Sequence, residues 1–271
     1  MNLPRLGAYV ALVVFFTWVA LPIVWATTLS LKTGADIIRI PTGFIFSPTL
    51  ENYIRVLHSG EFMHQFGNSL VIGFMSTLLS LLIGVPAAYT LQRFRFAGRE
   101  RIDFWILSTR MAPPVIVLIP YFLVFQKLGL TDSRLAIIIM HLSVNLVLVV
   151  WLMKGYFSDV PEELTEAALV DGCTDWGAFF RINLPLAMGG MAATAVLAFM
   201  FSWNELMFAL ILSGSQSKTA PVGVLNFIGF EQVAWGPLMA ATIVMMIPIV
   251  VFATAVQRTL VRGMTFGAVK G

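Results

Sequence analysis

The residue types that carry catalytic and metal chemistry are few and scattered in this chain of 271 residues. There is one cysteine, Cys173, which excludes an internal disulfide, and the three histidines are His58, His64 and His141. Their spacing does not form a zinc site, and the sequence has neither a His-Glu-x-x-His motif nor a phosphate-binding Gly-x-x-x-x-Gly-Lys-Ser/Thr loop. We therefore predict no catalytic residue, no metal and no cofactor.

Two charged residues, Arg110 and Glu205, lie well inside apolar segments. A charge at the centre of a membrane helix costs about 2.5–3.5 kcal/mol, which favours an inward-facing or paired position. Arg110 lies roughly 12 Å from the inner end of its segment at 1.5 Å per residue, so it either faces inward or snorkels to the interface. Glu205, the preceding Asn204 and the more distant Asn145 are candidates for a polar pathway or a subunit interface. We expect Glu205 and Asn145 to face lipid in the isolated chain.

Three prolines fall within the apolar segment that contains Arg110, namely Pro113, Pro114 and Pro120. In a membrane, neighbouring helices and water satisfy the backbone groups that a proline frees, and broken helices often line transport pathways. This segment is therefore a candidate pathway element, with a simple packing kink as the open alternative.

Residues 158–185 form the one long polar insertion between apolar segments, and their pattern predicts two short helices. Asp159 followed by Glu162 predicts a capping box at the first helix, and Gly172 predicts its end. Thr174 or Asp175 would cap the second helix, which Pro185 would end. The apolar residues that we expect to share a face in each helix, and to be available for docking, are Leu164, Ala167 and Ala168 in the first and Trp176, Phe179 and Phe180 in the second.

The composition is that of an integral membrane protein. Hydrophobic residues make up 58% and charged residues only 11% of the chain, whereas a soluble domain is roughly one quarter charged. Apolar segments long enough to span a bilayer occur at about 6–31, 69–91, 102–126, 135–157, 187–212 and 237–256. The sequence thus predicts an all-α protein with six transmembrane helices, and a folded external cap at about 32–67.

The distribution of Lys and Arg predicts the orientation in the membrane. Ten of the 17 lie on the side of the two termini and the 158–185 insertion, six lie on the other side, and Arg110 lies within a span. Because basic residues are enriched in cytoplasmic loops, we expect both termini and the insertion to be cytosolic. The net charge of +3 is explained in the same way, so we predict no nucleic-acid partner.

The 158–185 insertion resembles the cytoplasmic loop of ABC importer permeases, in which a coupling helix docks on the ATPase subunit. The resemblance rests on the motif residues Glu166, Ala167, Ala168, Asp171, Gly172, Leu184 and Pro185. Met111-x-Pro113 and Trp203-Asn204-Glu205 are similar to the carbohydrate-uptake branch of these permeases. The tail over 257–271 resembles that of the second permease subunit of maltose-type importers.

The resemblance implies a type I (MetI-like) permease fold, with residues 1–271 forming one transmembrane domain. It implies a plasma-membrane protein of a bacterium or archaeon that forms half of the pathway for a sugar or sugar-like solute. The implied partners are a homologous permease in a heterodimer, two cytosolic ATPase subunits and an external solute-binding protein. ATP hydrolysis would take place on the partner chains.

Three other functions compete with this interpretation. The chain could be an ABC permease for a non-carbohydrate solute, which the motifs do not exclude. A secondary carrier would normally have more spans arranged as repeated halves, and it would have no use for the 158–185 insertion. An intramembrane enzyme would need paired aspartates or a metal motif within the spans, and the sequence has neither.

Overall fold

A computed structural model describes residues 3–39, 45–229 and 232–267. The described chain is helical apart from one isolated antiparallel bridge, between Ile228 and Val233. In chain order the elements are α1 (Leu3–Ser30), α2 (Gly34–Ile38), α3 (Glu51–Leu57), α4 (Gly60–Arg93), α5 (Arg99–Thr109), α6 (Pro114–Lys127), α7 (Arg134–Ser158), α8 (Glu162–Val170), α9 (Asp175–Ala178), the π-helix η1 (Phe179–Asn183), α10 (Leu184–Leu186), α11 (Met188–Trp203), α12 (Met207–Leu212), α13 (Ala220–Val224), the 3₁₀ helix η2 (Leu225–Phe227) and α14 (Trp235–Gly267). The last residues of the tail that resembles maltose-type permeases, 268–271, lie outside the described part.

Four described helices are long and apolar enough to cross a membrane, and there are up to six spans if each of two bent helix pairs is one span. The four are α1, α4, α7 and α14. The segment predicted as the third span is broken at Arg110–Pro113 into α5 and α6, which are inclined at 93°. The second bent pair joins Asp175–Leu186 to α11 at 74°. The segment predicted over 187–212 is therefore not one helix, because it is interrupted between Trp203 and Met207.

One compact unit is formed by residues 1–66 and 222–247. Its buried apolar cluster includes Val56, Phe62 and Val244. The Asn52 side-chain amide donates hydrogen bonds to the backbone oxygens of Ser30 and Lys32, which ties α3 to the end of α1. The predicted external cap at 32–67 thus contains α2, α3 and the start of α4, while residues 40–44 lie outside the described part.

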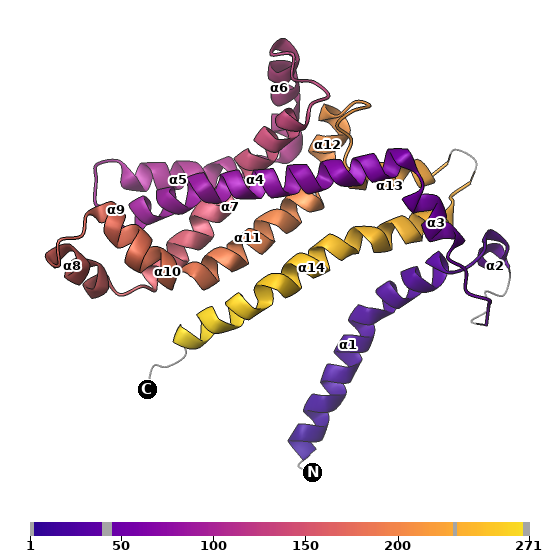
Figure 1. The fold of residues 1–271 in the computed structure, drawn as a ribbon, viewed down its shortest axis with the longest axis horizontal. Coiled ribbons are helices and arrows are strands. Elements are labelled where there is room, and N and C mark those ends of the chain that lie inside the picture. The colour runs from indigo at the N-terminus through magenta and orange to yellow at the C-terminus, as the bar shows by residue number, and fades with distance from the viewer. Residues whose placement is uncertain (1–2, 40–44, 230–231, 268–271) are drawn as a thin grey trace. The chain divides into compact units, whose positions relative to one another are not determined.

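The other unit is formed by residues 67–221 and 248–271, and it contains the candidate sites. Within it α4, α7 and α11 run side by side (Figure 1) around a core that includes Val85, Val149, Met153 and Ala198. These helices are apolar on nearly all faces. In soluble proteins such helices are found only in the interior, and otherwise the pattern is typical of membrane spans. The helices α8, α9 and α10 lie at the end of α7 (Figure 1).

The contact between α7 and α11 depends on a glycine. A Cβ atom at Gly190 would lie 2.1 Å from Cγ of Tyr156, an atom at the base of the ring that cannot move away cheaply. Gly155 precedes Tyr156 in the same helix, and no atom lies within 4 Å of the position that a Cβ would take there. The backbone conformation is the same at the two glycines, and the difference is how closely a neighbouring side chain approaches.

We expect Gly190→Ala to destabilise the protein by about 1–3 kcal/mol, because overpacking forces the Tyr156 ring and the two helices apart. The matched change Gly155→Ala should be neutral or stabilising by up to about 1 kcal/mol, because alanine is the better helix former. Thermal unfolding of the two purified variants in the same detergent checks the prediction. Equal melting temperatures would show that α7 and α11 do not pack this closely.

The segment that follows α12 is held by a carboxylate. Oδ1 of Asp132 accepts hydrogen bonds from the backbone amides of Gly214 (2.7 Å) and Ser217 (2.9 Å), and both carboxylate oxygens lie 3.1 Å from the amide of Gln216. Burial raises the pKa of Asp132, but the hydrogen bonds outweigh it and lower the pKa to about 2. The ionised form of Asp132 therefore stabilises the folded segment.

This depressed pKa predicts a pH dependence of stability. A group with a lower pKa in the folded than in the unfolded state stabilises the fold above its unfolded pKa, here about 4, and the effect is lost as the pH falls towards 2. We expect the melting temperature of the wild type to fall between pH 5 and pH 3. Asp132→Asn, which tolerates the same positive φ of 56°, should be less stable at pH 7 and should depend less on pH over this range. Parallel pH slopes for the two proteins would contradict the assignment.

Candidate functional site

The first helix of the insertion begins differently from the sequence prediction. Helix α8 starts at Glu162 after Pro161, with no side-chain cap, and Asp159 instead follows the end of α7. The predicted capping box of Asp159 and Glu162 is therefore wrong. Proline is tolerated at a helix start, because its missing amide hydrogen would have no partner within the helix and its fixed φ suits the first turn.

The turn between the two helices is confirmed in detail. Gly172 has a φ of +87°, in the left-handed region that favours glycine. The amide of Cys173 donates to the backbone oxygen of Ala168 (2.9 Å), and the amide of Gly172 donates to that of Leu169 (3.0 Å). This pair of bonds is a Schellman motif, which satisfies the last carbonyls of α8 and reverses the chain.

Thr174 is the cap of the second helix, since its hydroxyl accepts a hydrogen bond from the amide of Gly177 (3.1 Å). The helix continues through a π-turn at η1 and past Pro185 to Leu186, so Pro185 does not end it. The ring of Phe179 is buried against Tyr89 and Phe157. The expectation that Trp176, Phe179 and Phe180 are all available for docking is therefore wrong for Phe179.

The insertion exposes the eight residues named in the next sentence, and we call this set the docking face. Glu166, Ala167, Asp171, Gly172 and Pro185 are exposed, and so are Leu164, Trp176 and Phe180. Leu184 is half-buried and Ala168 is buried, so these two support the loop from within. The rings of Trp176 and Phe180 are stacked, with centroids 5.9 Å apart. Large apolar side chains that are exposed together are typical of protein-binding sites, and Glu166 and Asp171 add exposed carboxylates to this set.

The sequence pattern does not reveal the residues that hold this loop. Asn183 is completely buried, and its side-chain amide donates to Thr165 Oγ1 (3.1 Å) of α8. Arg93 at the end of α4 donates to Asn183 and to the backbone oxygen of Val160. The apolar signal of the neighbouring spans hides these polar residues, and only their convergence in space identifies them.

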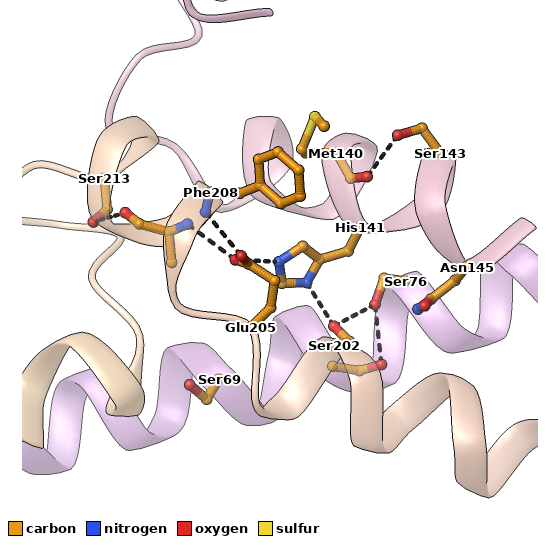
Figure 2. A network of polar contacts seen from close by, with 12 residues as sticks. Ser69, Ser76, Met140, His141, Ser143, Asn145, Ser202, Glu205, Phe208 and Ser213 are labelled. Carbon is orange, nitrogen blue, oxygen red and sulfur yellow. Dashed lines mark hydrogen bonds and ion pairs between the residues drawn. The ribbon is translucent and has the colours of Figure 1, made fainter. Parts of the chain in front are cut away.

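A second candidate site lies at the break between α11 and α12 (Figure 2). Glu205 is in this break, and its carboxylate accepts hydrogen bonds from the amides of Phe208 (2.9 Å) and Ala209 (3.1 Å) in the first turn of α12. Its Oε2 lies 3.3 Å from Nε2 of His141, whose side chain is only 2% exposed. Negative charge at a helix N-terminus is favourable, so Glu205 stabilises the start of α12.

The polar network continues from His141 to a neighbouring helix. Nδ1 of His141 lies 2.6 Å from Oγ of Ser202 on α11, and this hydroxyl lies 2.9 Å from Oγ of Ser76 on α4. Four buried or half-buried polar side chains, from three helices and the break, thus serve as hydrogen-bond partners for one another (Figure 2). Sequence reasoning does not single out His141, because its partners are 61 and 64 residues away.

Two polar residues do not face lipid as we expected. Asn145 is 2% exposed and donates to the backbone oxygen of Ala198 (3.1 Å), so it joins α7 to α11. The side chain of Glu205 is 18% exposed, because His141 and the start of α12 cover it. Partners within the chain thus cover both side chains, and the expectation that these side chains face lipid is wrong.

The remaining candidates lie on exposed surfaces. Asn204 is exposed and donates to the backbone oxygen of Met200 (2.8 Å). Pro113 and Pro114 start α6 at the break that follows Arg110, and Pro120 lies within α6. Arg110 directly follows α5, and its guanidinium lies over the ring of Phe201, 5.2 Å from the centroid. Among the described residues no group of three or more His, Cys, Asp or Glu could hold a metal ion.

Comparisons with known proteins agree with this architecture. Residues 80–266 match the family described as "Binding-protein-dependent transport system inner membrane component". The chain is 37% identical to a probable ABC transporter permease protein, y4oR, of Sinorhizobium fredii, over 92% of this chain and 90% of that protein. It is 35% identical to the trehalose transport system permease protein SugB of Mycobacterium tuberculosis, over 93% and 92% of the two chains.

The fold is similar to that of a solved importer. The similarity to a chain of a bacterial ABC transporter "involved in the import of the acidic polysaccharide alginate" has a TM-score of 0.77, with 25% identity, over 94% of this chain and 95% of that chain. A second solved structure, of the MetNI methionine ABC transporter, has a TM-score of 0.59 at 16% identity, over 81% and 99% of the chains. The predicted all-α, MetI-like permease fold is thereby confirmed.

Proposed function

The chain belongs to the family of inner membrane components of binding-protein-dependent transport systems, and on that premise we propose how it works within an ABC importer. It is a multi-pass permease subunit of such an importer. We infer that it pairs with a homologous permease to form the pathway, receives solute from an external binding protein, and is driven by two cytosolic ATPase subunits. ATP is hydrolysed on those ATPase subunits.

The observation that carries the proposal is the docking face of the 158–185 insertion. Gly172 and its Schellman turn hold α8 and α9 as one compact unit, and Glu166, Ala167 and Asp171 are exposed on it. Small residues allow a partner's backbone to approach closely, and the carboxylates offer charge complementarity to a basic cleft. The excess of Lys and Arg on the same side as this insertion supports a cytosolic position.

We propose that the solute is a carbohydrate. The trehalose permease and the alginate importer to which the chain is similar are both named for carbohydrates, although one is a disaccharide and the other a polysaccharide. The motif Trp203-Asn204-Glu205, which is similar to the carbohydrate-uptake branch, lies where α11 ends and the break begins. Trp203 is buried at this break and Asn204 is exposed beside it, so the second site also falls where the sequence resembles that branch.

Reconstitution into liposomes tests the proposal. The purified chain alone should neither hydrolyse ATP nor take up trehalose or maltose, whereas the complex with its partner permease, ATPases and binding protein should hydrolyse ATP. Stable assembly of the chain with an ATPase subunit is expected in co-purification. Ion-driven uptake by the chain alone, without ATP, would overturn the proposal in favour of a secondary carrier.

A further inference from the structure

The inner end of α4 is bound to the coupling loop by one side chain. Arg93, the last residue of α4, has a side chain that is only 9% exposed. Its Nη2 donates to the backbone oxygen of Val160 at 2.6 Å, with longer contacts to Asn183 Oδ1 (3.3 Å) and to the oxygen of Phe157 (3.4 Å). Its Nη1 lies 3.4 Å from Glu162 Oε1, in the first turn of α8.

These contacts join three elements through one guanidinium group. Phe157 lies in the last turn of α7 and Val160 just after it, and a cation is favourable at the C-terminus of a helix. Glu162 begins α8, and Asn183 is in turn hydrogen-bonded to Thr165, one turn further along α8. A guanidinium group has five donors in a fixed fork, so it can hold several acceptors at once, which the single ammonium of lysine does less well.

The same helix reaches the second candidate site. Ser76 lies on α4, 17 residues before Arg93, which corresponds to about 25 Å at 1.5 Å per residue. Its hydroxyl is bonded to Ser202, which is bonded to His141 beside Glu205. Ser76 and Arg93 lie on one continuous helix, with Pro86 between them, so α4 links the two sites physically.

We propose that Arg93 is a positioning residue that locks α8 to the inner ends of α4 and α7, so that movement of α8 on the ATPase reaches the break at Glu205. This inference rests on the proposed coupling function of the 158–185 loop. It assigns to Arg93 a transmitting role and not a contact with the ATPase, because only 9% of the side chain is exposed.

A reporter on the loop after α12 tests the transmission. In a Cys173→Ser background, the exposed Gln216 is replaced by cysteine, and its rate of maleimide labelling is measured in the assembled importer with and without ATP and vanadate. We expect the nucleotide to change the labelling rate when Arg93 is present. Arg93→Gln should reduce this change about fivefold or more, the size of a typical coupling effect, while ATP hydrolysis continues.

Matched variants separate transmission from folding. Arg95→Gln removes an exposed arginine from the same segment and should leave the nucleotide response unchanged. Arg93→Lys, which keeps the charge, should restore part of the response. Thr165→Val, which removes the bond to Asn183 without changing the size of the side chain, should weaken it and serves as the test if Arg93→Gln does not assemble.

The failure of this inference is distinguishable from failure of the proposed function. Gly172→Val is measured in the same assay, because it strains the turn of the docking face itself. If Gly172→Val abolishes the nucleotide response but Arg93→Gln and Thr165→Val respond like Arg95→Gln, the role of Arg93 is overturned and the coupling function stands. If Gly172→Val also responds normally, the coupling function fails.

Discussion

Gly172→Val is expected to abolish ATP-driven solute uptake by the assembled importer while the complex still reaches the membrane. The φ of +87° at this position places a β-branched residue in the left-handed region, at a cost of roughly 1–2 kcal/mol or more. A Cβ here would meet no atom within 4 Å, so the strain lies in the backbone and not in packing. The turn should open and displace α8 relative to α9, which uncouples hydrolysis from transport.

The control is Gly172→Asn. Asparagine tolerates the left-handed conformation, so this variant should keep the Schellman turn and retain most of the uptake. Uptake per ATP hydrolysed in proteoliposomes measures the difference, and immunodetection of the complex in membranes confirms assembly. Wild-type uptake by Gly172→Val would show that the insertion is only a connector.

Glu205→Ala is expected to reduce both transport and thermal stability. The change removes the acceptor for the amides of Phe208 and Ala209 and leaves the ring of His141 buried without its charged partner. A buried polar group that loses its partner costs about 1–3 kcal/mol. The break between α11 and α12 should therefore lose its defined geometry, together with any pathway function that depends on it.

Glu205→Gln separates charge from hydrogen bonding. Glutamine keeps the size of the side chain and one acceptor oxygen, so its stability should lie between that of the wild type and that of Glu205→Ala. Asn204→Ala is the neighbouring control for stability alone, because Asn204 is exposed and its side chain donates to the backbone of Met200 among the contacts described. Unchanged uptake and unchanged melting temperature in Glu205→Ala would exclude a role of this carboxylate in the pathway or the subunit contact.

The sequence was sufficient to predict the membrane class, the helical fold and the two short helices of the 158–185 insertion. Hydrophobic length and the low charge content are local properties, so they can be counted along the chain without knowing its contacts. The turn at Gly172 and the cap at Thr174 are equally local, since each concerns bonds within about five residues. For this reason the turn was predicted at the right residue, and the cap was narrowed to Thr174 or Asp175, of which the structure shows Thr174.

Only the tertiary structure decided which polar residues act together. His141 contacts Glu205, which is 64 residues away in the sequence, and Arg93 contacts Asn183, which is 90 residues away. The periodicity of an apolar helix does not reveal such pairs. The breaks at Arg110–Pro113 and after Trp203 are likewise seen only in the structure, because a proline or an asparagine permits a break without requiring one. The capping box at Asp159 failed for a local reason instead: the amide of Asp159 bonds to the last turn of α7, and α8 begins after Pro161 without it. Local chemistry thus determined the elements of this protein, and packing between distant segments determined its sites.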